Sequence, residues 1–248
     1  GTRSIIKLGP DIMFVTDEGY LTVSSLLPLS FGKDNSRINE FIKGAASTAV
    51  AANPTGFGWQ VVVSPSNNIL VVNVPGSDST IVQHVLNVNT MAWCRFTGIN
   101  ARCWAVYGND LYFGSTNGTV YLYGPEFLDD GEEVTSVYQS PYLSLNKAAQ
   151  SQTTAFRPRA RIDGNLTMTV KSSIDFKPFS LPYTVSYAFT GAAWGDPWGS
   201  PWATSNTVIN YLNMNSVGYD ISVSLTFTCG GLVDYFETNF LYRRSSRI

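Results

Sequence analysis

The chain has 248 residues, of which 44% are hydrophobic and only 14% charged, so it can bury the core of one large domain or two smaller ones. Its formal net charge of −2 excludes the overall basic field on which general nucleic-acid binding depends. Ser, Thr, Asn and Gly take the place of charged residues, a composition typical of exposed strand faces and of subunit contacts.

The three cysteines form neither a CxxC pair nor an even-numbered disulfide framework. Cys94, Cys103 and Cys229 lie in apolar, strand-like surroundings, so we expect reduced core residues in a protein made in a cytosol. No apolar run approaches the roughly 18 residues of a membrane helix. No signal peptide is visible, and a chain that starts at Gly1 rather than Met is expected to be a piece of a longer protein.

An internal repeat is the clearest signal in the first half of the chain. Residues 11–23 (DIMFVTDEGYLTV) match residues 110–122 (DLYFGSTNGTVYL) at a constant offset of 99. Both copies have Asp first, an aromatic residue fourth, a hydroxyl residue sixth and Gly ninth. Because Gly tolerates positive φ in tight turns, each copy predicts a β-hairpin, and together they predict two equivalent structural units.

One helix is predicted between the two copies, over residues 36–52. Asp34 or Ser36 can cap its first turn, and Asn53-Pro54 ends it. The helical spacing i, i+3, i+4, i+7 predicts an apolar face made of Ile38, Phe41, Ile42 and Ala45.

Four short strands follow the helix. Apolar runs bounded by turn residues predict them over 59–63, 69–74, 81–88 and 92–96. A four-stranded meander of about 40 residues has the size of one β-propeller blade, and residues 101–124 supply the strands of the next.

The second half of the chain has a period of two and no helical period. Residues 126–133 are acidic and predict a linker, since their spacing matches no known calcium loop. Seven strands are then predicted over 134–145, 153–162, 166–172, 183–189, 207–214, 219–229 and 232–242. The expected fold is all-β: partial propeller-like blades with one inserted helix in 1–125, and an antiparallel β-sandwich in 134–248.

The residues needed for catalysis are scarce. The single histidine, His84, lies inside a predicted strand with no nucleophile or acid beside it, and His with three scattered Cys makes a poor zinc site. Asp11 and Asp110 are equivalent in the repeat, which favours a role in the fold: accepting backbone hydrogen bonds before a strand. We therefore expect no enzyme activity, no cofactor and no metal. A propeller hydrolase would need two acids facing each other across a central channel.

Two candidate interfaces stand out. Two prolines keep the segment 194–202 (WGDPWGSPW) out of regular structure. Its rings can plug the end of the sandwich, contact a subunit or stack on carbohydrate. The basic end of the chain is either a solvated tail or a contact for an acidic partner, phosphate included. The candidate interface residues are Trp194, Trp198, Trp202, Arg243, Arg244 and Arg247.

Several motifs together resemble a known family. They span residues 11–24, then GWQ at 58–60, NILVVNVP at 68–75, 87–98 with its WCRFTG, and 109–118. With these motifs, the chain resembles β-propeller virion proteins of short-tailed phages and prophages, of the packaged-DNA stabilisation or tail-hub type. The likeness covers nearly the whole chain, and the tryptophan-proline loop and the C-terminal strands share it.

The resemblance implies a structural protein of the virion, made in the host cytoplasm and placed at the portal–tail junction or tail hub. Its expected partners are portal and tail proteins and further copies of itself, with DNA as a candidate neighbour of the arginine-rich end. No catalytic residue is carried over. The alternative is a carbohydrate-binding module of a host-recognition protein, which requires Trp194, Trp198 or Trp202 on an exposed platform.

Overall fold

The computed structural model of the chain describes residues 5–26, 40–54, 58–77, 81–124, 127–146, 149–188, 206–208 and 210–245. Within these ranges the chain is all-β, as predicted: antiparallel strands form several sheets, and none of the sheets closes into a barrel. The chain divides into two compact units, Gly1–Pro125 and Glu126–Ile248, which we call unit 1 and unit 2.

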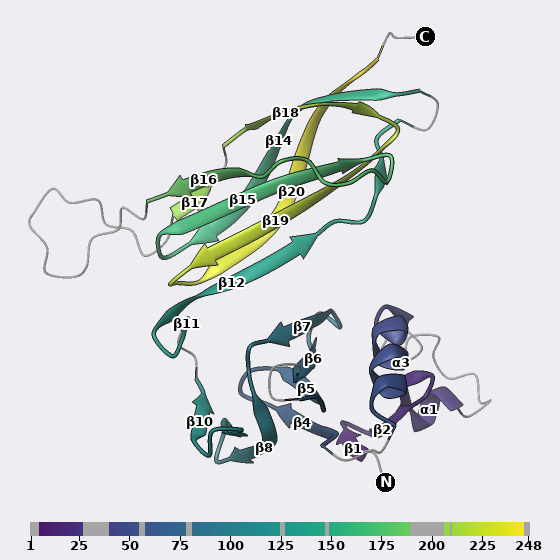
Figure 1. Cartoon of the computed structure of the whole chain (residues 1–248), viewed down its shortest axis with the longest axis vertical. Coiled ribbons are helices and arrows are strands. Elements are labelled where there is room, and N and C mark those ends of the chain that lie inside the picture. Colours follow the sequence, from purple (N-terminus) through teal and green to yellow (C-terminus); the bar gives the residue numbers. More distant parts are fainter. Residues whose placement is uncertain are drawn as a thin grey trace, which may run out of the picture. The chain divides into compact units, whose positions relative to one another are not determined.

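The described part of unit 1 contains three antiparallel sheets (Figure 1). The first sheet consists of β1 (Ile5–Leu8), β2 (Asp11–Thr16) and β3 (Gly19–Thr22). The middle sheet consists of β4 (Gln60–Ser64), β5 (Ile69–Val74), β6 (Val82–Asn87) and β7 (Trp93–Thr97). The third sheet consists of β8 (Ala101–Tyr107), β9 (Asp110–Ser115) and β10 (Val120–Tyr123). Strands that are consecutive in the chain pair with each other, so each sheet is a meander.

The two copies of the repeat are both β-hairpins, which confirms the prediction. The likeness also extends one strand upstream, because Leu8 pairs with Asp11 as Tyr107 pairs with Asp110. The glycines in these two-residue turns, Gly9 and Gly108, have φ values of 60° and 64°, a conformation that favours Gly. The second hairpin loop is one residue longer than the first, so β3 and β10 are equivalent with a shift of one residue.

The middle sheet contains the four strands predicted over 59–96, and it is packed on both faces. This explains why β5 is buried along its whole length. One face shares a core with the first sheet that includes Met13, Val15, Tyr20, Leu70, Val72 and Leu86. The opposite face shares a second core with the third sheet that includes Ile69, Val71, Val85, Trp104 and Leu111.

The predicted helix is shorter than expected within the described residues. Helix α3 is Lys43–Ala52, and a single helical turn that was not predicted, α1 (Val23–Leu26), follows β3. The predicted apolar face is confirmed at Ile42, which is buried, but it is wrong at Phe41, which is 80% exposed, and at Ala45, which is exposed; Ala46 and Val50 are buried instead. Ile42, Ala46 and Val50 are spaced i, i+4, i+8, so they lie on one side of α3 and its N-cap residue, Ile42. Ile38, also predicted on this face, lies outside the described residues.

Unit 2 is a sandwich of two antiparallel layers, both visible in Figure 1. One layer consists of β11 (Leu128–Asp129), β12 (Glu132–Gln139), β13 (Leu143–Ser144), β15 (Leu166–Ile174), β16 (Tyr183–Tyr187) and β19 (Asp220–Cys229). The other consists of β14 (Ser151–Ile162), β17 (Asn206–Val208), β18 (Leu212–Gly218) and β20 (Val233–Arg244). The core between them is formed by alternate residues of both layers, among them Phe156, Met168, Met214, Leu225 and Phe227.

Three details of unit 2 differ from the prediction. Residues 126–133, predicted as a linker, contain β11 and the start of β12, which pair around a turn at Asp130-Gly131. The predicted strand over 134–145 is interrupted between β12 and β13. The N–H of Ser140 still donates to the carbonyl oxygen of Val223 in the register of β12, but the N–H of Val223 donates to Ser140 Oγ. The stretch predicted as a strand over 207–214 contributes to both β17 and β18.

Candidate assembly surfaces

Side-chain amides tie the middle sheet to the third sheet. Gln60 donates through Nε2 to the carbonyl oxygen of Trp104 at 2.6 Å, and its Oε1 accepts from the backbone N–H of Trp104 at 2.7 Å. Asn73 Oδ1 accepts from the indole Nε1 of Trp104 at 3.0 Å and from Gln83 Nε2 at 3.0 Å. Asn73 and Gln83 are buried, so these bonds form away from water and fix how the third sheet sits on the middle one.

The first sheet is tied to the middle sheet by Tyr20 of β3 and His84 of β6, which are both buried. The Tyr20 hydroxyl lies 2.7 Å from His84 Nδ1. Burial lowers the pKa of His84, and the charge of Arg95, its cross-strand partner, lowers it further. Burial also raises the pKa of Tyr20. His84 is therefore a buried histidine on a strand, in the position that the sequence predicted.

Asp11 has the role in the fold that its place before a strand predicted. Its Oδ1 accepts from the backbone N–H groups of Ile12 at 2.8 Å and Ser24 at 3.2 Å, and the Ser24 hydroxyl donates to Oδ2. Desolvation raises the pKa of Asp11, but the hydrogen bonds from Ser24 and Ile12 outweigh it, so the pKa is lowered. The equivalent Asp110 is an exposed residue at the start of β9.

The outer face of the first sheet is apolar; it is bare at Ile5 and Ile12, whereas Phe14 and Leu21 are half-buried. Ile5, Phe14 and Leu21 are successive cross-strand partners, so they form one row across the three strands. Ile12 lies beside this row on the same face, and Ile5 and Ile12 are 70% and 44% exposed. We call these four residues, Ile5, Ile12, Phe14 and Leu21, the Ile12 face.

The outer face of the third sheet is bare as well. Val120 and Leu122 in β10 are 70% and 51% exposed. They lie on the far side of the sheet because Leu111 and Phe113, at the alternate positions of β9, pack against the middle sheet. Cross-strand pairing places five residues on this surface, which we call the Val120 face: Cys103, Ala105, Tyr112, Val120 and Leu122.

A groove of about 390 Å³ lies in unit 2, lined by residues of β12, β19 and β20. Tyr138 and Tyr235 line it with ring centroids 5.1 Å apart, and the ring of Phe227 lies 5.7 Å from that of Tyr235. β19 pairs with β12 from Val134 to Gln139. Among the described strands, only the two residues of β11 pair with the other edge of β12, so most of that edge is open to a further strand.

A row of arginines crosses the outer face of the second layer of unit 2. Arg157, Arg159 and Arg161 alternate along β14 and therefore point to the same side. The guanidinium of Arg159 is ion-paired with Glu237 at 3.6 Å, and that of Arg161 with Asp234. These pairs are exposed, so each contributes at most about 1 kcal/mol to stability. Sequence reasoning missed this row, although RPRAR at 157–161 within a strand is the signal that predicts it.

The structure describes two of the six predicted interface residues. Arg243 and Arg244 are exposed at the end of β20, and Arg243 Nε donates to Gln152 Oε1 at 2.8 Å. They belong to a paired strand, not to a frayed tail. Arg247 and the three tryptophans lie outside the described residues, so the roles of the tryptophan loop and the carbohydrate-binding alternative stay predictions. The residues left outside are Trp194, Trp198, Trp202 and Arg247.

The prediction that all three cysteines are core residues is wrong for two of them. All three are free and lie in strands, but Cys94 and Cys103 are exposed and only Cys229 is buried. Cys103 alternates with the buried Trp104 along β8 and so lies on the Val120 face. Burial of the Cys94 thiol raises its pKa, although the residue as a whole is exposed.

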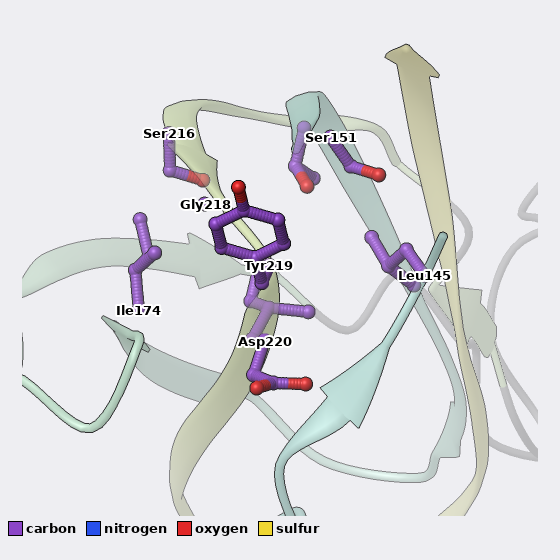
Figure 2. Close-up of a pocket in the computed structure, with 9 residues that line it drawn as sticks. Leu145, Ser151, Ile174, Ser216, Gly218, Tyr219 and Asp220 are labelled. Atoms are coloured by element: carbon purple, nitrogen blue, oxygen red, sulfur yellow. The ribbon is translucent and has the colours of Figure 1, made fainter. Parts of the chain in front are cut away.

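Among the described residues, no group of three or more His, Cys, Asp or Glu side chains could hold a metal ion. None of the described helices is long and apolar enough to cross a bilayer. The pocket in Figure 2, lined by Ser151, Ser216 and Tyr219 among others, has a volume of about 10 Å³ and room for about one water molecule.

No family model and no curated protein matches the chain. Its function must therefore be argued from its surfaces. The two bare faces are the surfaces that sequence reasoning missed, although a signal was present. Apolar residues at consecutive positions in 12–15 and 111–113 are typical of strands buried on both faces, whereas an exposed sheet face predicts alternation.

Proposed function

We propose that the protein is a structural component of a phage or prophage virion, placed at the portal–tail junction or tail hub. It acts there by protein–protein assembly rather than by catalysis, and its three stacked sheets are propeller-like blades. One observation carries the proposal: the middle sheet of unit 1 is covered on both faces, while each flanking sheet leaves an apolar face bare.

The energetics of the bare faces favour assembly. Fully burying an aliphatic side chain contributes about 1.5–3 kcal/mol, and Ile5, Ile12, Val120 and Leu122 are each more than two-fifths exposed. Contiguous exposed apolar surface is a mark of interaction sites. The low content of charged residues adds support, because charge is depleted at the centre of protein interfaces.

The proposed partners are portal and tail proteins and further copies of the chain. Arg243 and Arg244 are exposed and basic, so packaged DNA is a candidate neighbour of this end of β20. The resemblance of the sequence motifs to virion proteins of short-tailed phages supports this placement.

Deletion of the gene from the phage or prophage that carries it tests the proposal. We expect DNA-filled heads without functional tails, rescued by the wild-type chain supplied in trans. Mass spectrometry of gradient-purified particles should detect the chain in the rescued particles. Normal tails in the deletion strain, or purified particles that lack the chain, would contradict the proposal.

A further inference from the structure

The faces of the two repeat units are used in opposite ways. Ile5 and Trp104 occupy equivalent positions, since each is the cross-strand partner of the repeat phenylalanine, Phe14 or Phe113. Trp104 is 4% exposed and packs on the middle sheet, whereas Ile5 is 70% exposed. The Ile12 face is therefore the bare equivalent of a face that the third sheet buries.

The reverse holds for the other side of each sheet. Tyr20 is the cross-strand partner of Val15, and Val120 is the partner of the equivalent Gly114. Tyr20 is fully buried against the middle sheet, whereas Val120 is 70% exposed. The Val120 face is therefore the bare equivalent of the face that the first sheet buries.

This pattern defines the direction of the stack. Residues at equivalent positions of a strand point to the same side of their own sheet. If the first and third sheets faced the middle sheet as mirror partners, Met13 and its equivalent Tyr112 would both contact it. Met13 does and Tyr112 does not, so the two sheets repeat head to tail.

From this geometry we propose that the Ile12 face of one copy packs on the Val120 face of a second copy. The contact is heterologous, so a pair of copies has one bare face at each end. Further copies add to these faces until the row closes into a ring or continues as an open filament. This inference rests on the proposed function, for which it names the partner.

Charge supports the same pairing. Lys7 pairs with Ile12 and lies at the Ile12 face, and Asp110 pairs with Tyr107 at the side of the Val120 face. Both are exposed, so the two faces carry opposite charges beside their apolar rows. A face-to-face pairing of like surfaces would instead bring like charges together, which is unfavourable.

The size of the faces sets the expected affinity. Three strands with four to seven residues each cover about 14 Å by about 20 Å. That is smaller than a standard interface and typical of weak, reversible association. We therefore expect self-association that grows with concentration and is visible by about 1 mM, where a Kd of that order gives substantial complex.

The test uses one variant for each face and a matched control. Ile12→Glu blocks the first sheet's face, and Val120→Glu blocks the third sheet's face. Val217→Glu in β18 is the control, because Val217 is an exposed strand residue of unit 2 with the same 44% exposure as Ile12. Sedimentation velocity of the full chain gives the stoichiometry, and thermal unfolding in dilute solution checks the fold.

We expect the wild type and the Val217→Glu control to form dimers and larger species. Ile12→Glu and Val120→Glu should each be monomeric alone, because each has lost one half of the contact. Mixed in equal amounts they should form a 1:1 dimer and nothing larger, since one intact face remains on each partner. Only a heterologous contact gives this result.

Several outcomes overturn the inference. They are a wild type that stays monomeric to about 1 mM, a single variant that still self-associates, and a mixture that stays monomeric. A Tm of Ile12→Glu or Val120→Glu well below that of the control in dilute solution also overturns it. That result means that the face is covered within its own chain.

The association experiment and the particle experiment test the head-to-tail contact and the virion role independently. If purified virions contain the chain but the mixture of variants stays monomeric, the head-to-tail contact is wrong and the virion role stands. If the mixture dimerises but virions lack the chain, the contact stands and the virion role is wrong.

Discussion

The side-chain amide of Gln60 bonds both backbone groups of Trp104, at 2.6 and 2.7 Å, and so occupies the place of a neighbouring strand for that residue. The bond pair joins β4 of the middle sheet to β8 of the third. A backbone-like contact between stacked sheets fixes their register, which apolar packing alone leaves adjustable.

Gln60→Met keeps the length of the side chain but removes both bonds. We expect it to destabilise the protein by about 1–3 kcal/mol, because the N–H and C=O of the buried Trp104 lose their partner. Urea unfolding measures the change. Gln139→Glu, at an exposed position of β12, is the control and should unfold like the wild type. Equal stability of Gln60→Met and wild type would show that the amide contributes nothing net.

His84 makes stability depend on pH. Burial, with a smaller effect of Arg95, lowers its pKa in the folded protein, so the unfolded state takes up the proton first as the pH falls. His84 therefore makes its full contribution to the free energy of unfolding above the ordinary histidine pKa of 6.5. That contribution declines as the pH falls below 6.5 toward the folded pKa. The slope contributed by one proton is at most about 1.4 kcal/mol per pH unit.

Thermal unfolding of the wild type and of His84→Gln between pH 7.5 and 5 tests this dependence. His84 is the chain's one histidine, so the variant removes the whole histidine contribution. We expect the variant to be less stable at pH 7.5, because the bond to Tyr20 is changed, but to lose less stability on acidification. Parallel pH profiles would exclude His84 as the titrating group.

Gly218 is required by its packing at the point where β18 leads into β19 (Figure 2). A Cβ at this position would overlap the Cγ2 methyl of Ile174 and lie 2.8 Å from Asp175 Oδ2. Gly218→Ala should therefore destabilise unit 2 by about 1–3 kcal/mol, the usual cost of overpacking.

Gly44→Ala is the opposite case and serves as the control. Gly44 lies in α3, where an added Cβ meets nothing within 4 Å. Alanine has the higher helix propensity, so this variant should stabilise the protein by about 0.5–1 kcal/mol. Calorimetry of both variants checks the pair. Opposite shifts in Tm are expected, and a Gly218→Ala protein as stable as the wild type would contradict the steric argument.

Local patterns in the sequence predicted the strands well, and contacts between distant residues explain the failures. The strands of the middle sheet follow from apolar runs and turns such as the one at Asn68, which has a φ of 53°. The predicted apolar face of the helix fails at Phe41 and Ala45, because α3 begins only at Lys43 and its phase does not follow from the residues before it. The pairing of β14 with β20 joins segments some 80 residues apart, and no local rule predicts it.

The candidate surfaces were harder to predict because exposure depends on what lies opposite. Equivalent repeat residues such as Ile12 and Leu111 have the same chemistry, yet one is 44% exposed and the other fully buried. The sequence shows that both residues are apolar. It does not show which of the two is covered by a neighbouring sheet. Composition drew attention instead to the tryptophan loop and to the arginines near Arg243.

The cysteines provide a test of the Val120 face that requires no substitution. Cys103 is exposed on this face, Cys229 is buried in the core of unit 2, and the raised pKa of Cys94 leaves less reactive thiolate at a given pH. We expect a maleimide reagent at pH 7 to modify Cys103 first, Cys94 more slowly, and Cys229 only after denaturation. Peptide mass spectrometry gives the order. Because the head-to-tail contact covers Cys103, its modification should slow as the protein concentration rises, while that of Cys94 stays constant.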